Sequence, residues 1–396
     1  MPTSETWKMH RKLMADTMSQ AFLNNAAGPQ MHKNALALIR LWREKARLAR
    51  GHPFTAIEDV KAAAMDIIWG ATFGSQMNVS DAQTALLSGL EHIEQPVSTE
   101  LEIVFPRAPE PEDFNAIITI CDSCEIPIKS LVPRFQHRWS LRLIPRFRKA
   151  VAHKDQLIKE SLQHAWQKFS VAADDDDAVK CALDLVVQRE AQMAKKEGRA
   201  PEWDTADIRD ELFGFLVAGH DTSSTSLLWA FKRISDNQHV QDKLRAALRS
   251  AYPHAIEAGE LPTAKGISTT RVPYLDAVIE EVHRVSGAVA INMRVATVDT
   301  EVLGHRIPKG TDVFMLSQGP GFVMPSIPID EKVRSASSRD SKDKNGAWDE
   351  ATIHQFDPER WLEEDSEGNV VFNSRAGPTM PFGAGPRGCF GNSPRS

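Results

Sequence analysis

A cysteine inside a run of glycines and prolines, near the end of the chain, limits most strongly how this sequence can fold. The run spans residues 381–391 and reads Pro-Phe-Gly-Ala-Gly-Pro-Arg-Gly-Cys-Phe-Gly. A regular helix or strand is disfavoured here, because glycine is costly in both and proline removes a backbone donor. We therefore expect a tight loop that brings backbone amides close to the thiol of Cys389. Amides aimed at a sulfur stabilise its thiolate, which is a metal ligand, and Arg387 adds a cation able to bind a carboxylate.

A buried, inert cysteine in a glycine-rich turn is the simplest alternative for this loop. The full spacing Phe-x-x-Gly-x-Arg-x-Cys-x-Gly is met, however, at Phe382, Gly385, Arg387, Cys389 and Gly391. The stretch resembles the haem-binding loop of the cytochrome P450 family, in which a cysteine thiolate ligates the iron. The resemblance implies that Cys389 is the axial ligand of haem b. It also implies that Phe382 packs beside the cysteine and that Gly391 belongs to the cofactor-binding loop.

The composition argues against several other classes of protein. The chain has 396 residues, of which 42% are apolar, enough for a sizeable globular core. The net charge is −6 and there is no large basic block, so we expect no nucleic acid partner. Four cysteines are too few for a disulfide scaffold and indicate a reducing compartment. Cys121 and Cys124 form a C-x-x-C without a second pair or a nearby histidine pair, and we interpret it as incidental.

The first residues do not have the pattern of a secretion signal. Residues 1–4, Met-Pro-Thr-Ser, lead directly into a polar, charged segment. No apolar run approaches the length of a membrane span, and residues 212–219 are among the longest. We therefore expect a soluble chain without anchor or signal. Full-length members of the resembled family are typically found on the endoplasmic reticulum membrane, facing the cytosol.

A helix over residues 5–24 is predicted to carry Trp7 and Arg11 on one face, because the two are four positions apart. An amphipathic surface helix is the alternative from the residues alone. In the resembled family a W-x-x-x-R pair begins the third main helix, and both residues reach a haem propionate. The same resemblance suggests Lys8 and Lys12 as docking charges for a redox partner. It also implies a chain that is truncated at both ends.

Several further helices are expected between the two ends. One covers residues 29–50, and another begins at a Thr55 cap and runs to Gly74. Helical patterns continue over residues 114–167, where prolines interrupt them. Residues 174–177 are read as a solvated acidic turn rather than a metal site. Asp177 would then cap a helix over residues 178–196.

The longest helical pattern covers residues 204–235, with Asp204 or Thr205 as its cap. Phe215, Ala218, Gly219 and Thr222 fall on one face. A glycine in mid-helix costs about 1 kcal/mol relative to alanine. Either the close approach of a flat cofactor or packing against another helix would explain it. The Thr222 hydroxyl can bond to the carbonyl of Ala218 and loosen the helix there.

Residues 218–222, Ala-Gly-His-Asp-Thr, match the A-G-x-[DE]-T oxygen-activation motif of the cytochrome P450 family. The resemblance makes Asp221 and Thr222 the catalytic residues and places Ala218 and Gly219 against the cofactor. His220 occupies the variable position of the motif, so we assign it no role.

Pro273 is expected to begin a helix that ends at about residue 286, with Leu275, Val278, Ile279 and Val282 as its buried stripe. Glu281 and Arg284 are three apart and can pair, although an exposed pair contributes little. An E-x-x-R before the cysteine loop is a signature of the resembled family, and its usual partner is an arginine in a P-E-R segment. Arg360 fills that place. The resemblance therefore implies a structural triad of Glu281, Arg284 and Arg360.

Residues 293–314 alternate apolar and polar types around Ile-Pro-Lys-Gly at 307–310, which predicts a strand, a turn and a strand. By resemblance, Arg294 makes a second propionate contact and residues 288–292 border the substrate pocket. Residues 319–348 are expected to form a charged, mobile loop. After Gly391 only five residues remain, and Pro394 does not suit the helix that follows in the family.

Together these patterns predict a mainly α fold with a minor β-region. Residues 1–396 would form a single partial cytochrome P450 haem domain with its long helix at 204–235, its E-x-x-R helix at 273–286 and its cysteine loop at 381–391. The implied function is a haem-thiolate monooxygenase that inserts one oxygen atom of O₂ into an apolar organic substrate, in fungal secondary metabolism. An NADPH-dependent cytochrome P450 reductase would supply electrons.

Two alternatives remain open at this stage. One is a haem-thiolate isomerase, dehydratase or nitric-oxide reductase, against which the intact Asp221–Thr222 pair argues. The other is a catalytically inactive, truncated remnant. The sequence does not identify the substrate.

Overall fold

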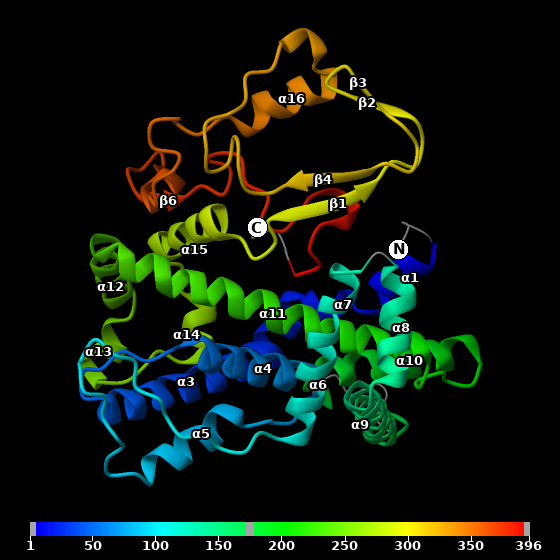
Figure 1. Ribbon diagram of the computed structural model, residues 1–396, viewed down its shortest axis with the longest axis vertical. Coiled ribbons are helices and arrows are strands. Elements are labelled where there is room, and N and C mark those ends of the chain that lie inside the picture. The colour runs from blue at the N-terminus through cyan, green and yellow to red at the C-terminus, as the bar shows by residue number, and fades with distance from the viewer. Residues whose placement is uncertain (1–4, 131, 172–177, 392–396) are drawn as a thin grey trace. The chain divides into compact units, whose positions relative to one another are not determined.

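The computed structural model describes residues 5–130, 132–171 and 178–391. The chain divides into two compact units, Met1–Ser224 and Thr225–Ser396. The division lies inside the longest helix, α11 (Ala206–Asp236), which contributes to both units. Figure 1 shows the helices and strands of each unit. The predicted fold class is confirmed, because helices dominate both units and the few strands are short.

The first unit is entirely helical in its described residues. Figure 1 shows its helices in blue to green, with α3, α4 and α5 packed side by side. Its elements are α1 (Glu5–Leu13), η1 (Ala15–Met18), α2 (Gln20–Phe22), η2 (Leu23–Ala27), α3 (Gly28–Ala49), α4 (Ile57–Phe73), α5 (Val79–Ser88), α6 (Glu112–Ser123), α7 (Glu125–Ile128), α8 (Pro133–Leu143), α9 (Pro145–Phe169), α10 (Ala182–Glu197) and the first part of α11.

The predicted helix over residues 5–24 is broken into shorter pieces. α1 ends at Leu13, and Thr17 then turns back to donate from both its backbone N–H and its hydroxyl to the carbonyl of Met14. Ser19 starts the next helix by accepting from the N–H of Phe22. These side-chain bonds compete with a continuous helix, which is the general effect of Ser and Thr on helices.

Two predicted helix caps are wrong. Thr55 does not cap α4, because the helix begins at Ile57 and its N-cap position is occupied by Ala56. The backbone N–H of Thr55 donates to the carboxylate of Glu102. α10 begins at Ala182 rather than 178, and its cap is Cys181, whose sulfur accepts from the N–H of Asp184. The proposed cap Asp177, with the rest of 174–177, lies outside the described residues.

Proline and threonine mark other helix ends. Two of the prolines that were expected to interrupt the helical pattern begin new helices. Pro133 and Pro145 each occupy the first turn of a helix, α8 and α9, where the missing N–H has no cost. Thr205 caps α11 by accepting from the N–H of Ile208. Gly74 ends α4 in a left-handed conformation with φ = 71°.

The core of the first unit forms where α4, α6 and α11 meet. Met65 and Trp69 of α4 pack with Phe114 and Ile117 of α6 and with Leu216 of α11. The buried stripe of α11 repeats every four residues and consists of Ile208, Leu212, Leu216, His220 and Ser224. The predicted functional face lies beside this stripe rather than on it, since Ala218 and Thr222 are exposed.

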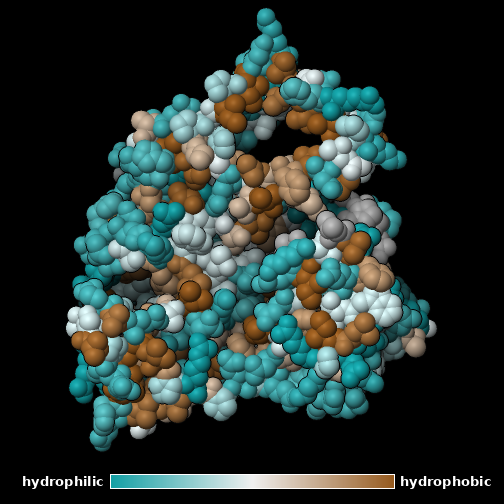
Figure 2. Space-filling model, viewed as in Figure 1, coloured by the Kyte–Doolittle hydropathy of each residue, from teal (hydrophilic) through white to brown (hydrophobic). Residues whose placement is uncertain are grey.

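α8 buries none of its described side chains. Figure 2 shows apolar side chains, in brown, at the surface near α7 and α8. Phe135 and Leu143 are 65% and 68% exposed, and Trp139 packs against Phe135 with ring centroids 5.9 Å apart. This stretch therefore does not contribute to the core of the unit.

In its described residues, the second unit combines helices with three two-stranded sheets. Figure 1 shows β1 and β4 as its longest strands. Its elements are the second part of α11, then α12 (Gln238–Ala251), α13 (Pro253–Ala258), α14 (Ala264–Thr269), α15 (Pro273–Ser286), β1 (Ile291–Val295), β2 (Thr300–Val302), β3 (His305–Ile307), β4 (Asp312–Leu316), η4 (Glu331–Val333), α16 (Ala336–Asn345), η5 (Pro358–Trp361), β5 (Leu362–Glu364), β6 (Val370–Phe372) and η6 (Gly385–Arg387).

Antiparallel pairing organises the predicted β-region. β1 pairs with β4 and β2 pairs with β3. The β2–β3 hairpin turns at Leu303 and Gly304, which have φ values of 51° and 82°. The predicted Ile-Pro-Lys-Gly turn lies one connection later, between β3 and β4, where Gly310 has φ = 88°. β5 and β6 form a further hairpin that the sequence analysis did not anticipate.

α15 matches its predicted bounds, but its buried stripe differs in part. Val278 and Val282 are buried as expected, whereas Leu275 and Ile279 are only partly buried. Two charged residues, Glu281 and Arg284, are buried in their place.

The segment over residues 319–348 is not a structureless loop. It contains η4 and the helix α16, and Trp348 at its end is buried. The Trp348 indole N–H donates to the carbonyl of Pro378 at 2.8 Å. A buried aromatic side chain at the end of the segment anchors it to the unit, so the prediction of an irregular loop is wrong.

Candidate active site

The cysteine loop of the second unit folds as a tight, self-contacting turn. The N–H of Cys389 donates to the carbonyl of Phe382 at 2.7 Å, which brings these two residues together. Gly383 and Gly385 both have φ = 67°, a left-handed conformation that other residue types adopt with strain. The Cys389 side chain is exposed and forms no disulfide. The loop therefore presents a free thiol on a backbone that two glycines make possible.

Phe382 links this loop to α15. Its ring lies 5.0 Å from the ring of His283, measured between centroids, in an edge-on arrangement. A Cβ added to Gly287, just after α15, would lie 3.9 Å from Pro381 of the loop and 3.1 Å from the carbonyl oxygen of His283. The start of the cysteine loop therefore packs on the C-terminal end of α15.

Glu281 of α15 is the centre of a buried polar cluster. It is 0% exposed and accepts hydrogen bonds from five donors. Arg284 provides two of them, at 2.7 and 2.8 Å, and Arg360 provides one at 3.2 Å. The indole N–H of Trp361 and the backbone N–H of Asp357 complete the set, each at 2.9 Å. A buried carboxylate with this many donors has its desolvation offset by charge-assisted bonds.

Arg284 extends the cluster to the backbone of three distant positions. Its guanidinium donates to the carbonyls of Phe322 at 2.5 Å, Ile353 at 2.8 Å and Gln355 at 2.9 Å. The guanidinium also lies 5.5 Å from the ring centroid of Trp348. The predicted meeting of Glu281, Arg284 and Arg360 therefore occurs, and the group is fully buried rather than an exposed pair.

Sequence reasoning missed two tryptophans of this cluster. Trp361 donates to Glu281, and Trp348 lies beneath both Arg284 and Arg360, with Arg360 at 5.3 Å from its ring centroid. Trp361 follows Arg360 directly in the P-E-R segment, so its indole donor was visible in the sequence. No comparable signal marks Trp348, because it lies 13 residues before Trp361 in a polar stretch.

The motif of α11 lies in the first unit. The Thr222 hydroxyl donates to the carbonyl of Ala218 at 2.7 Å, as the sequence predicted. The helix nevertheless continues without a break from Ala206 to Asp236, so the expected loosening is not seen. Asp221 and Thr222 are both exposed.

Gly219 has a packing explanation in this structure. A Cβ built on it would lie 2.5 Å from a side-chain carbon of Ile68 on α4, closer than real contacts. The residue is therefore a glycine that allows two helices to approach, which is the alternative that the sequence left open.

His220 belongs to the core of the unit rather than to the exposed motif face. It is 4% exposed, and neither ring nitrogen has a hydrogen-bond partner among the described residues. Burial lowers the pKa of its ring below the usual value of 6.5. Burial therefore favours the neutral form of the ring.

Cys121 of α6 lies within electrostatic reach of the α11 motif. Burial, together with the neighbouring Cys124 and the Asp221 carboxylate, raises the pKa of the Cys121 thiol to about 12. A thiol with so high a pKa is not ionised at neutral pH and is a poor nucleophile.

α1 carries the two predicted propionate donors side by side. The Arg11 guanidinium lies 5.6 Å from the ring centroid of Trp7, so the two share one face as expected. Lys8 on the same helix pairs with Glu5 at 2.7 Å, and Lys12 is exposed.

In the second unit, Arg294 lies on β1 and Arg387 in η6. One guanidinium nitrogen of Arg294 donates to the carbonyl of Met293 at 2.9 Å. Arg387 directly precedes the two residues that close the cysteine loop, Gly388 and Cys389.

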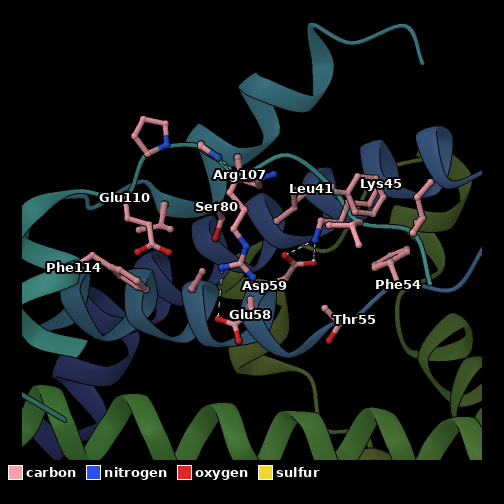
Figure 3. A pocket seen from close by; sticks show the side chains of 18 of the residues that line it. Leu41, Lys45, Phe54, Thr55, Glu58, Asp59, Ser80, Arg107, Glu110 and Phe114 are labelled. Carbon is pink, nitrogen blue, oxygen red and sulfur yellow. Dashed lines mark hydrogen bonds and ion pairs between the residues drawn. The ribbon is translucent and has the colours of Figure 1, made fainter. Parts of the chain in front are cut away.

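A separate cavity of about 130 Å³ lies in the first unit between α3, α4, α5 and the segment over residues 102–110 (Figure 3). Lys45 and Asp59 form a buried ion pair in its wall, with the Lys45 ammonium 2.7 Å from both carboxylate oxygens. The same ammonium lies 5.4 and 5.0 Å from the ring centroids of Phe54 and Phe105. None of the predicted site residues lines this cavity.

Comparison with known proteins decides the family. The model described as Cytochrome P450 matches residues 1–320 and 343–393, which is most of the chain. The chain belongs to the cytochrome P450 family. The predicted family is thereby confirmed. The internal stretch that the family model leaves out, residues 321–342, covers η4 and the start of α16.

Curated relatives of this cytochrome P450 are fungal monooxygenases. It is 41% identical over 392 residues to cytochrome P450 monooxygenase GME11363 of Pestalotiopsis microspora, a match that covers 98% of this chain and 68% of the relative. It is 35% identical over 415 residues to cytochrome P450 monooxygenase TRI13 of Fusarium sporotrichioides, covering 98% of this chain and 70% of the relative. The predicted oxidoreductase class, a haem-thiolate monooxygenase of fungal type, agrees with these matches.

Solved structures confirm the fold. A mutant of the cytochrome P450DA heme domain has a TM-score of 0.63 at 18% identity, covering 99% of this chain and 68% of that chain. Haem iron with a cysteine thiolate ligand is the cofactor of this family. The residues present fit haem. The second unit offers an exposed free thiol on a loop whose backbone conformation favours glycine. Arginine and tryptophan side chains, which can bind the haem carboxylates, occur in the chain as well.

Proposed function

We propose that this cytochrome P450 binds haem b through Cys389 and inserts one oxygen atom of O₂ into an apolar organic substrate, reducing the other atom to water. The observation that carries the proposal is the cysteine loop: its complete spacing, its two left-handed glycines and its exposed thiol. Residues 1–396 then belong to a single haem domain. The fungal relatives support a substrate from secondary metabolism.

Six side chains would hold the cofactor. Cys389 would supply the axial thiolate and Phe382 would shield it, which the short bond between their backbones supports. Trp7, Arg11, Arg294 and Arg387 would bind the two propionates, because an indole N–H and guanidinium groups are suitable carboxylate donors. When bound, thiolate-ligated haem supplies the electron density that favours O–O bond cleavage.

The backbone around these side chains would shape the same site. Gly391 would end the loop. Ala218 has a small side chain and Gly219 has none, which would allow the backbone of α11 to lie close to a flat ring. The contact of Gly219 with Ile68 occupies the direction of a missing side chain, so any cofactor contact at Gly219 would involve its backbone.

Asp221 and Thr222 would deliver protons to the reacting oxygen. The Thr222 hydroxyl already donates its proton to the Ala218 carbonyl, which leaves its oxygen lone pairs free to accept a proton or a water hydrogen. Rotation of the hydroxyl would then pass a proton on. Asp221, exposed beside it, would replenish protons from solvent, which is the role of a carboxylate in general acid–base catalysis.

The triad of Glu281, Arg284 and Arg360 would act as a structural support and not in catalysis. Its bonds bind the end of α15 to the segments around Phe322 and residues 353–361, and the cysteine loop packs on the same end of α15. A rigid platform of this kind would hold the thiolate in place.

Electrons would come from an NADPH-dependent cytochrome P450 reductase. Lys12 is the better docking charge on α1, because Lys8 is engaged with Glu5. We place the working enzyme at the endoplasmic reticulum membrane on the cytosolic side, by analogy with its family. Among the described residues, no helix has the length and apolar character needed to cross a bilayer.

The absorption spectrum of the reduced, haem-supplied chain under carbon monoxide tests the proposal. Thiolate ligation by Cys389 predicts a strongly red-shifted Soret band, and Cys389→Ser should lose it. Lack of haem uptake would instead support an inactive remnant. Product formation that continues unchanged in Thr222→Val, with no O₂ consumed, would support the isomerase or dehydratase alternative.

A further inference from the structure

His10 on α1 connects that helix to α11 through a hydrogen bond of one ring nitrogen, and its other ring nitrogen lies near a second carboxylate. Nδ1 lies 2.8 Å from a carboxylate oxygen of Glu211, and Nε2 lies 3.4 Å from a carboxylate oxygen of Asp207. The side chain is only 14% exposed. Asp207 and Glu211 are four residues apart and therefore occupy one face of α11. The imidazole thus lies between two carboxylates of α11 within the first unit.

His10 lies close along α1 to Trp7 and Arg11, two of the proposed propionate donors. His10 directly precedes Arg11 and follows Trp7 by three residues, so the three side chains lie on neighbouring rows of one helix. The Arg11 guanidinium in turn lies over the Trp7 ring at 5.6 Å. A rotation of α1 about its axis would move all three side chains together. The contacts of His10 with Asp207 and Glu211 oppose such a rotation.

A second set of contacts holds the C-terminal end of α1. Arg189 of α10 donates to the carbonyl of Lys12 at 3.0 Å and forms an ion pair with the carboxylate of Asp16. The two sets of contacts come from α11 and α10, and they hold α1 at different positions. Together they fix both the axial rotation and the C-terminal end of a helix of nine residues.

We infer that His10 is a positioning residue for haem binding. By holding α1 against Glu211 and Asp207 it keeps Trp7 and Arg11 oriented for the haem propionates. Directed donors to a carboxylate tolerate displacements of only about 0.5 Å, so a helix free to rotate would bind propionates poorly. The inference rests on the proposed haem function and assigns His10 no contact with the cofactor.

Haem release separates this role from a merely structural one. Haem dissociation would be measured by transfer to excess apomyoglobin, for wild type and His10→Ala, with haem b and with haem whose two propionates are methyl esters. Loss of a residue that orients cofactor ligands typically costs roughly 10- to 100-fold in affinity. We therefore expect His10→Ala to release haem b at least about tenfold faster and to release the diester at the wild-type rate. Arg11→Gln should behave in the same way.

Matched variants on the same helix provide the control. Lys8→Gln removes the exposed Lys8–Glu5 pair, whose two partners both lie on α1, and should leave haem release unchanged. Glu211→Gln should reproduce part of the His10→Ala effect. His10→Gln, which keeps one donor and a similar volume, should fall between wild type and His10→Ala. Circular dichroism and the melting temperature of each apoprotein establish that the variants are folded. If His10→Ala does not fold, His10→Gln takes its place in the haem-release measurement.

Two results would overturn the inference while leaving the proposed function intact. The first is an unchanged rate of haem b release in both His10 variants. The second is an equal acceleration for haem b and the diester, which would show general loosening of the fold. A wild-type chain that takes up neither haem would overturn the proposed function, and the inference with it.

Discussion

Glu281 and Arg284 form a two-point ion pair in which neither side chain reaches solvent. The pair lies on one turn of α15, and Arg284 uses its remaining donors to hold the backbone carbonyls of three residues between 322 and 355. Most ion pairs at this helical spacing are exposed and weak. Here the pair joins separate segments of the second unit, so its loss should be felt well beyond α15.

Glu281→Gln should strongly destabilise the protein. The substitution preserves shape but leaves the buried Arg284 and Arg360 without a counter-charge, and breaking a buried pair in this way costs about 3–5 kcal/mol. Urea unfolding of wild type and variant measures the difference. Lys243→Gln, which breaks the exposed Lys243–Glu359 pair, should cost less than about 1 kcal/mol. A Glu281→Gln variant as stable as this control would contradict the prediction.

Trp361→Phe removes one hydrogen-bond donor and part of an aromatic ring from the same cluster. Glu281 loses the indole donor at 2.9 Å, and an unsatisfied buried acceptor costs about 1–3 kcal/mol. Because Trp361 is fully buried against Trp348, the smaller ring also leaves a cavity, so the free energy of unfolding should fall by at least that amount. If Trp361→Phe proves neutral, a water molecule or another donor replaces the indole. The double variant with Glu281→Gln would then show no coupling between the two positions.

Thiol labelling should distinguish the four cysteines. Cys124 and Cys389 are exposed, whereas burial raises the pKa of Cys121 and of Cys181 to about 12. Iodoacetamide at pH 8 should therefore modify two thiols quickly in the haem-free chain. Haem loading should reduce this number to one by protecting Cys389, as peptide mass spectrometry can identify. Labelling of Cys389 at an equal rate with and without haem would refute its ligand role.

Thr222→Val tests the proton pathway of the proposed mechanism. The variant keeps the side-chain volume and removes an exposed hydroxyl, so the free energy of unfolding should change by less than about 1 kcal/mol. Product formation per NADPH consumed should fall by about 10²-fold, the lower end of the effect of general acid–base catalysis. Ser223→Ala, at the adjacent exposed position, should leave this ratio intact. Loss of coupling in both variants would point to helix distortion instead.

His220 should make the protein less stable in weak acid. Burial lowers the pKa of the folded-state ring below 6.5, so below pH 6.5 the unfolded chain binds a proton that the folded chain does not. Stability from this residue is therefore present above pH 6.5 and is lost as the pH falls, by at most about 1.4 kcal/mol per pH unit. Urea unfolding at pH 7.5 and pH 5.5 should show a smaller loss for His220→Leu than for wild type. Equal losses would mean that His220 is protonated in the folded state.

The cysteine loop and the long helices could be predicted from the sequence because their signals are local. Glycine and proline at 381–391 disfavour a regular α-helix or strand, and Pro273 marks a helix start through its own missing donor. Pro133 and Pro145 were expected to interrupt the helical pattern, and each begins a helix. The Thr222–Ala218 bond could be foreseen for the same reason, since both partners lie within one turn of a helix.

The predictions that proved wrong share a physical cause. The backbone N–H of Thr55 bonds to the carboxylate of Glu102, 47 residues later, and α4 begins only at Ile57. The 319–348 segment is anchored because Trp348 is buried. The reason for Gly219 likewise depends on Ile68 of another helix. Each of these outcomes depends on a partner that is distant in the chain.

Residue types and short spacings thus set which chemistry the chain carries: a thiol on a glycine-rich loop, a hydroxyl and a carboxylate on a long helix, and the arginine and tryptophan donors. Folding was needed to enclose Glu281 with five donors, to pack Trp348 and Trp361 around the triad, and to bring His10 to Asp207 and Glu211. Burial and long-range contact are set by packing, and packing depends on the whole chain rather than on any one stretch of it.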